Sequence, residues 1–102
     1  MSLVDDLEII CGLMPKTELL AQLAEEATEL AHAALKLRRV CDGTNPTPVT
    51  EKQAIENLLE EIADVELCLI VLEYSDIIPT DDIEQIVEAK RKRWARRLDE
   101  NR

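Results

Sequence analysis

Apolar residues recur at alternating steps of three and four along two long stretches of the chain. Because an α-helix has about 3.6 residues per turn, this spacing gathers them on one face of a helix. The pattern predicts one long helix over about Thr17–Val40 and another from about Glu51 to Tyr74. The apolar positions are Leu20, Leu23, Ala27, Leu30, Ala34 and Leu37 in the first helix, and Ile55, Leu58, Ile62, Val65, Leu69 and Leu72 in the second. Such faces are typical of helices that pack side by side, in an antiparallel pair or a coiled coil.

A short helix is expected before this pair. It covers about Leu3–Ile10, with Ser2 as its N-cap and Gly12 as the residue that stops it. Pro15 then separates it from the first long helix. Between the two long helices, Cys41–Thr50 contains one Gly and two Pro residues, so a loop is expected there.

The sequence also indicates where the later helices begin. Thr50 starts the pattern Thr-Glu-Lys-Gln, which is typical of a capping box that ends at Gln53. A turn is expected at Ser75–Pro79. Thr80 is the expected N-cap of a last helix over about Asp81–Asp99, which has acids in its first turn and bases further on, as the helix dipole favours.

These elements predict an all-α fold. The chain of 102 residues suits one helical domain over residues 1–102. Its centre is expected to be a hairpin of the two long antiparallel helices, with the N-terminal and C-terminal helices beside it as in a four-helix bundle. Leu67–Leu72 is apolar around the whole helix, and a chain this short has little surface of its own to cover it. Oligomerisation is therefore expected to complete the bundle.

The chain is strongly acidic, with 22 acidic and 12 basic side chains and a net charge of −10. Phosphates and anionic lipids would be repelled, so neither nucleic acid nor a membrane is an expected partner. The longest uncharged apolar run is too short to span a bilayer. Three widely spaced cysteines without a paired motif are expected to be reduced thiols, and the first residues lack the bases of a signal peptide. These features favour a cytoplasmic protein that collects cations.

Two segments, LAEEATEL at residues 23–30 and LLEEIADV at residues 58–65, repeat one pattern 35 residues apart. Each has a doubled Glu and a further acid three residues after the second Glu. Glu26 and Glu29 therefore share one helix face at the edge of the apolar residues. Glu61 and Asp64 do the same on the other long helix. An antiparallel hairpin folded about Asn45 would place Glu26 level with Asp64. It would also place Glu29 level with Glu61.

Four carboxylates at one height repel one another, and any that are partly buried also lose hydration. Either some of them are protonated or a cation neutralises them. Carboxylate oxygens suit hard divalent ions such as Mg²⁺ or Mn²⁺. The alternative is a solvated acidic surface, since glutamate-rich helix faces are common. The spacing leaves both interpretations open.

The motif E25-E26-x-x-E29, followed by E61-x-x-D64, resembles the signature of the MazG-like nucleotide pyrophosphohydrolases, in the all-α NTP pyrophosphatase superfamily. The surrounding sequence segments, QLAEEATELAHAALK and NLLEEIADVELCLIVL, are also similar to sequences of that family. The resemblance implies Mg²⁺-dependent cleavage of a nucleoside triphosphate, NTP or dNTP, to a monophosphate and pyrophosphate. It also implies a homodimer or homotetramer. The metal ligands that it implies are Glu26, Glu29, Glu61 and Asp64.

The chain departs from this family pattern at two points. The Pro-rich loop makes the spacer between Glu29 and Glu61 long, which leaves the subgroup open. Cys68 stands where the related phosphoribosyl-ATP pyrophosphohydrolases often place a His a few residues after the final Asp. That difference argues against their substrate, and an enzyme of that kind remains an alternative.

Further residues are candidates for supporting roles. Glu25 is a candidate for accepting a proton from the attacking water, or for a place outside the ligand shell, although a solvated side chain is the simpler interpretation. Gln22 and Asn57 lie one turn before Glu26 and Glu61, where an amide can orient a ligand or bind substrate. Lys90 and Arg93, in the basic run KRKRWARR, are candidates for binding the triphosphate. Surface amides and a solvated basic helix are the corresponding alternatives.

Two other classes of protein compete with this hypothesis. His32 follows Glu29 in an ExxH motif, as in a di-iron redox bundle, but such a bundle needs two of these motifs and the chain has one His. A non-enzymatic helical interaction protein, whose acids only confer solubility, is the second alternative. Trp94 lies near the apolar stripe of the last helix and is expected to pack in a core or an interface.

Overall fold

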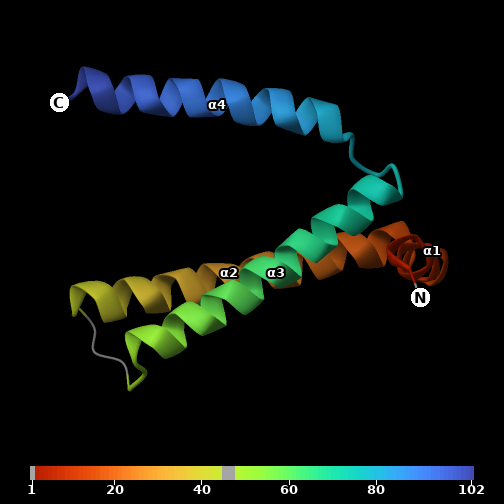
Figure 1. Cartoon of the computed structure of the whole chain (residues 1–102), viewed down its shortest axis with the longest axis horizontal. Helices are drawn as coiled ribbons and strands as arrows, with labels where there is room; N and C mark the ends of the chain where they lie inside the picture. The colour runs from red at the N-terminus through yellow and green to blue at the C-terminus, as the bar shows by residue number, and fades with distance from the viewer. Residues whose placement is uncertain (1, 45–47) are drawn as a thin grey trace.

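The computed structural model describes residues 2–44 and 48–102, and they form helices joined by short connections (Figure 1). The four helices are α1 (Leu3–Leu13), α2 (Lys16–Asp42), α3 (Glu51–Tyr74) and α4 (Thr80–Glu100). The described residues contain no strand. The all-α prediction is therefore confirmed. Asn45, about which the hairpin was expected to fold, lies outside the described residues.

Two helices begin at capping boxes, as the sequence predicts. The Ser2 hydroxyl accepts from the backbone N–H of Asp5, and the Asp5 carboxylate accepts from the backbone N–H of Ser2. Thr50 and Gln53 form the same reciprocal pair at the start of α3. These bonds satisfy N–H groups that have no partner inside the helix.

Two of the residues predicted to start or stop a helix do not do so. Helix α1 continues through Gly12 to Leu13, because the residues before Pro15 stop it and not the glycine. At α4, the N-cap is Pro79, which has an extended backbone, and Thr80 is already the first helical residue. The start of α4 therefore has no side-chain cap.

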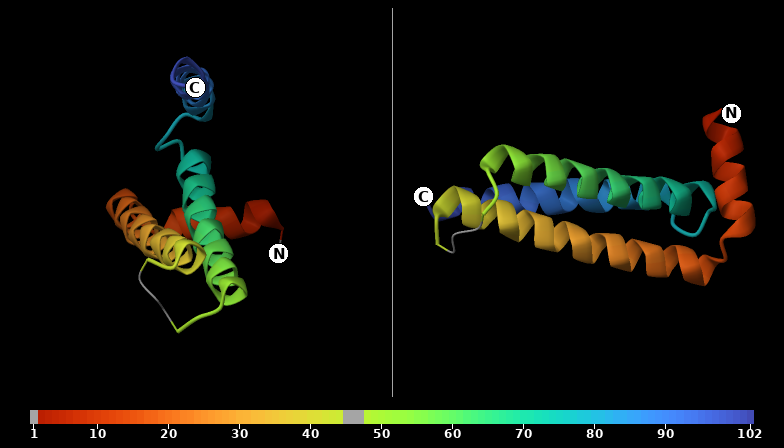
Figure 2. Two further views of the ribbon diagram at one scale, coloured as in Figure 1. Left: turned by 90° about the vertical axis from the view of Figure 1, so that its left-hand side faces the viewer. Right: turned by 90° about the horizontal axis from the view of Figure 1, so that it is seen from below.

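The two long helices α2 and α3 pack against each other as an antiparallel hairpin, and α1 lies across the end of the hairpin where α2 begins (Figures 1 and 2). A small core forms at this end from four buried residues. They are Leu7, Leu19, Val71 and Leu72. Further along the hairpin, Ala33 and Ala54 are buried. The predicted hairpin is confirmed.

The packed side of each helix agrees with the predicted one at half of its positions and is shifted by one residue at the others. The predicted positions that are shielded are Leu23, Leu30, Leu37, Leu58, Val65 and Leu72. We call the seam those shielded positions that follow one another at steps of three and four. They are Leu19, Leu23, Glu26, Leu30, Ala33 and Leu37 on α2 and Ala54, Leu58, Glu61, Val65, Cys68 and Leu72 on α3. Ile55, Ile62 and Leu69, which were expected in the seam, are 40%, 36% and 37% exposed. Each helix has apolar side chains over a wider arc than one neighbour can cover, so one edge of that arc remains in solvent.

Helix α4 is set apart from the hairpin. It runs back from the turn at an angle to α3, so that the two helices diverge, and none of its residues is buried (Figures 1 and 2). The turn before it is held in place, because Ile77 and Ile78 pack against the core and their N–H groups donate to the Leu72 carbonyl at 3.0 and 3.4 Å. Among the described residues, no helix is long and apolar enough to cross a membrane.

Candidate metal centre

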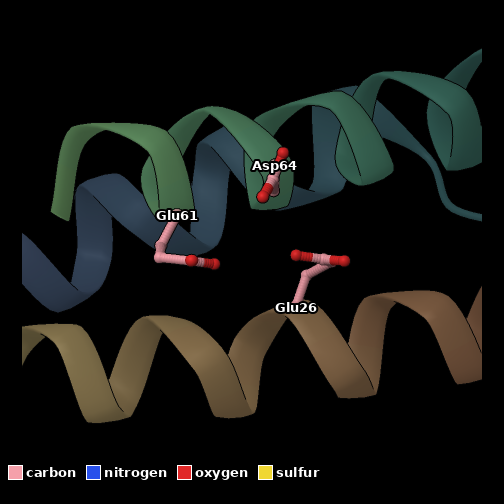
Figure 3. Close-up of side chains that lie close together, drawn as sticks. All are labelled: Glu26, Glu61 and Asp64. Atoms are coloured by element: carbon pink, nitrogen blue, oxygen red, sulfur yellow. The ribbon is translucent and has the colours of Figure 1, made fainter. Parts of the chain in front are cut away.

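Three carboxylates meet in the middle of the hairpin (Figure 3). Glu26 comes from α2, and Glu61 and Asp64 come from α3. Each offers an oxygen, and these oxygens lie within 4.8 Å of one another. Glu26 and Glu61 are partly buried, whereas Asp64 is exposed. We call these three residues the carboxylate group.

The packing of the helices explains why these acids meet. Glu26 and Glu61 occupy seam positions, so each points toward the opposite helix. Asp64 follows Glu61 by three residues and is its neighbour along the same side of α3. The antiparallel register then brings Glu26 opposite Asp64, as the sequence predicts. The sequence had placed both acidic pairs at the edge of the seam, and the structure shows that Glu26 and Glu61 lie within it.

Glu29 does not join the carboxylate group. It is exposed, although it is close enough to raise the pKa of both Glu26 and Glu61. A fourth carboxylate among these three would add to their repulsion, so an exposed place keeps Glu29 hydrated. The structure therefore brings together three of the four predicted ligands.

The negative charges of the carboxylate group are not balanced by a basic side chain among the described residues. Burial, and then the charges of Asp64 and Glu26, raise the pKa of Glu61. Burial and Asp64 likewise raise the pKa of Glu26, which the Gln22 amide partly opposes. In the part of the chain that the structure describes, no Lys or Arg forms an ion pair with any of the three acids. A divalent cation would supply the missing positive charge.

Gln22 is the one side chain that donates a hydrogen bond to the carboxylate group among the described residues. Its Nε2 donates to Oε1 of Glu26 at 2.8 Å, one turn along the same helix. This bond fixes one Glu26 oxygen and leaves the other free. Asn57 has the equivalent place before Glu61 and is partly buried, but no corresponding bond joins the two in the described structure.

A pocket of about 320 Å³ opens beside the carboxylate group. Its wall is mostly apolar and comes from α1, α2 and α3. The lining residues are Ile10, Met14, Leu19, Gln22, Glu26, Asp64, Leu67, Cys68 and Val71. Its volume is at the lower end of the range of about 300–1,000 Å³ that is typical of small-molecule sites. Burial and the nearby Glu26 and Asp64 charges raise the pKa of the Cys68 thiol, so it stays protonated.

Sequence reasoning missed this pocket. Its residues come from three helices, and only contacts across the fold bring them together. One of its residues, Cys68, had already been singled out in the sequence, because it follows Asp64 by one turn.

The remaining candidate residues lie elsewhere. Glu25 and His32 are exposed on α2. Lys90 and Arg93 are exposed on α4, and this helix passes behind α3 when the carboxylates are viewed from the front (Figure 3). The structure therefore does not place these two bases at the carboxylate group of their own chain.

Comparisons of this chain with protein-family models, with curated proteins and with solved structures gave no match. The resemblance to the MazG-like family, and every role that it implies, therefore stays a prediction. The geometry of the carboxylate group stands independently of that resemblance.

Proposed function

We propose that this protein is a Mg²⁺-dependent nucleotide pyrophosphohydrolase, which cleaves an NTP or dNTP to the monophosphate and pyrophosphate. One observation carries the proposal: three carboxylates from two helices have oxygens within 4.8 Å of one another. Such a group favours a hard divalent cation, and Mg²⁺ bound by a few carboxylates commonly also binds a phosphate substrate. A role in removing surplus or non-standard nucleotides is consistent with this chemistry.

Glu26, Glu61 and Asp64 would hold the cation, and Mn²⁺ is an alternative ion for the same oxygens. The ion, when bound, neutralises charge on the triphosphate and lowers the pKa of a water for attack on phosphorus. Besides burial, Glu29 raises the pKa of both Glu26 and Glu61 by its charge. Its expected role is a fourth ligand that closes on the loaded site.

The other residues near the carboxylate group orient and enclose the substrate. Gln22 keeps one oxygen of Glu26 turned toward it, which presents the second oxygen to the site. The apolar pocket beside Asp64 suits the uncharged nucleoside part of the substrate and excludes water from that side. The pocket lining contains no aromatic side chain. Base recognition should therefore be loose.

The uncovered apolar side chains support an assembly. Ile55, Ile62 and Leu69 on α3 and Trp94 on α4 are all exposed within one chain. Exposed apolar surface on several helices marks an interaction site. The expected assembly is a homodimer or a homotetramer.

A product assay tests the proposed activity. The chain is incubated with a panel of NTPs and dNTPs and Mg²⁺, and pyrophosphate, orthophosphate and nucleotide products are separated. Release of pyrophosphate with the monophosphate is expected. Orthophosphate with a diphosphate would show that the cleavage position is wrong. Including phosphoribosyl-ATP in the panel tests the related enzyme class directly.

A helical interaction protein without catalysis is the second candidate, and the exposed apolar surface favours it. Melting the protein with and without millimolar Mg²⁺ separates the two. A metal site is stabilised by its ion through mass action, so the melting temperature should rise. An unchanged melting temperature, together with no turnover of any nucleotide, would favour the interaction protein.

A further inference from the structure

Helix α4 has an apolar face with nothing packed against it. Val87, Trp94 and Leu98 are 58%, 69% and 62% exposed, and they lie within about 40° of one another around the helix. An isolated amphipathic helix gains most of its stability from packing that face. The turn before α4 is pinned to the core by Ile77 and Ile78, which restrains α4 from swinging onto its own hairpin.

The basic side chains of α4 fall into two sets, one opposite this apolar face and one along its borders. Lys92 and Arg96 lie about 160° from Trp94 and form ion pairs within the helix, with Glu88 and Glu100. Lys90, Arg91 and Arg97 border the apolar face, within about 60° of Trp94. Within the described residues these three form no ion pair. The bases that border the apolar face are therefore available to an acidic partner.

The acidic partner surface is present on the same protein. Helix α3 has seven acidic side chains and one basic side chain, whereas Lys90–Arg97 has six basic side chains and no acid. The carboxylate group has no cation paired with it in the described structure. This charge complementarity selects a second copy of the chain as the occupant of the α4 face.

The hairpin has two different faces. The residues one place after the seam form an apolar strip, and in an antiparallel pair they turn to the same side. The strip consists of Leu20, Ala27 and Ala34 on α2 and Ile55, Ile62 and Leu69 on α3. Asp64 and Gln22 lie on the other side of the seam, at the open edge of the carboxylate group. The apolar strip and the opening of the site therefore face in opposite directions.

We infer that two copies pack their apolar strips together. Helix α4 of each copy then covers the carboxylate face of the other copy, which is the side of the hairpin opposite the strip, where the carboxylate group opens. In one chain α4 passes behind α3, on the side away from the three carboxylates (Figure 3). A second hairpin packed strip to strip on that side turns its own carboxylate face toward this α4. Lys90 and its basic neighbours then lie beside the partner's site, where they bind the triphosphate. That last role rests on the proposed function, whereas the docking of α4 does not.

The docking of α4 is tested by sedimentation and by the fluorescence of Trp94, the one Trp of the chain. A dimer is expected at micromolar concentration, with Trp94 emission that shifts to the red when dilution separates the copies. The triple variant Lys90→Gln/Arg91→Gln/Arg97→Gln should weaken the dimer by roughly tenfold or more. Lys92→Gln/Arg96→Gln is the matched control and should leave it unchanged. A monomer, or Trp94 emission independent of concentration, would overturn the inference.

A mixed dimer tests whether α4 reaches the partner's site. One chain has Trp94→Phe with its acids intact, and the other keeps Trp94 but has Glu26→Gln, Glu61→Gln and Asp64→Asn. The two are unfolded together and refolded, and Mn²⁺, a paramagnetic quencher at short range, is added. Trp94 emission should fall in the mixture and stay constant for the acid-deficient chain alone.

The two proposals fail in different ways in this experiment. If calorimetry shows Mn²⁺ binding to the Trp94→Phe chain but the mixture shows no quenching, α4 does not cover the partner's site and the inference is wrong. If the wild-type chain binds no Mn²⁺, the proposed metal centre is wrong, and the dilution experiment alone decides the docking of α4.

Discussion

Glu26 and Glu61 occupy positions at which a helix pair ordinarily buries apolar side chains. The residues at equivalent places one or two turns away are Leu19, Ala33, Ala54 and Cys68. Two carboxylates at such positions weaken the packing of the hairpin, because each loses hydration and repels the other. A protein that keeps them there has a use for a concentrated negative charge, which is the physical basis for assigning a cation site.

The metal-free protein should be more stable at mildly acid pH than at neutral pH. The pKa of Glu61 is raised in the folded state, so the folded chain holds the proton more tightly than the unfolded chain does. The free energy of unfolding therefore falls as the pH rises from the ordinary glutamate pKa through the raised one. Urea unfolding in EDTA across this range measures the slope, and Glu61→Gln should reduce it. A Glu61→Gln protein with the wild-type slope would contradict the assignment.

Gln22 should tune metal affinity without being a ligand. Gln22→Ala removes the amide that donates to Glu26, so the free oxygen of Glu26 is no longer directed at the site. Affinity for Mn²⁺, measured by calorimetry, should fall by roughly tenfold. Asn57→Ala is the matched control, because Asn57 has the same place on α3 without that bond, and its affinity should stay near wild type. Equal losses in both variants would count against an orienting role for Gln22.

At the scale of the helix, local signals decide where each element starts. The capping box at Thr50 joins two side chains to two backbone N–H groups, whereas Thr80 lies inside α4 and caps nothing. Thr50→Ala should lower the free energy of unfolding by about 1 kcal/mol. Thr80→Ala should change it by much less, and denaturant unfolding compares the two. The reverse order would show that the cap assignments are wrong.

The sequence predicted the helices well because each signal for them is local. Periodicity identified both long helices, and the Thr50 cap lies where the pattern places it. The start of α4 was missed because a side-chain cap at Thr80 was expected, whereas the extended backbone of Pro79 provides the cap position. Half of the seam positions were misplaced by one residue, for a different reason. Ile55 and Ala54 are both apolar, and only the packing of α3 against α2 shows which of them is covered.

The candidate site was predictable to the extent that helical register fixes it. A pair of acids three residues apart on each long helix, together with an antiparallel hairpin, suffices to bring Glu26 opposite Asp64. The spacing did not predict that Glu29 stays outside the group, because repulsion among four acids is not part of a spacing rule. The pocket beside the carboxylates was out of reach, because Ile10, Leu19 and Leu67 meet only after α1 has crossed the end of the hairpin.

At the scale of the whole molecule, one chain leaves much of its apolar surface uncovered. The flat, open shape, 45 × 39 × 24 Å, follows from a hairpin from which α4 diverges. A stable fold of this size ordinarily buries more of its apolar side chains than the six that are buried among residues 2–44 and 48–102. Replacing Ile62 in the apolar strip by Lys should therefore lower the melting temperature and the sedimentation coefficient together. Loss of neither would mean that the strip faces solvent in the native protein.

The proposed activity, Mg²⁺-dependent release of pyrophosphate, depends on the carboxylate group of the hairpin. The most direct measurement compares this rate for wild type, Glu61→Gln and Asp64→Asn with that for Glu60→Gln, the exposed neighbour of Glu61 on the same helix. The first two variants should lose roughly a hundredfold or more of the rate, because each removes a ligand for the ion that stabilises the transferring phosphoryl group. Glu60→Gln should stay near the wild-type rate. Full Mg²⁺-dependent turnover in both Glu61→Gln and Asp64→Asn would contradict the account.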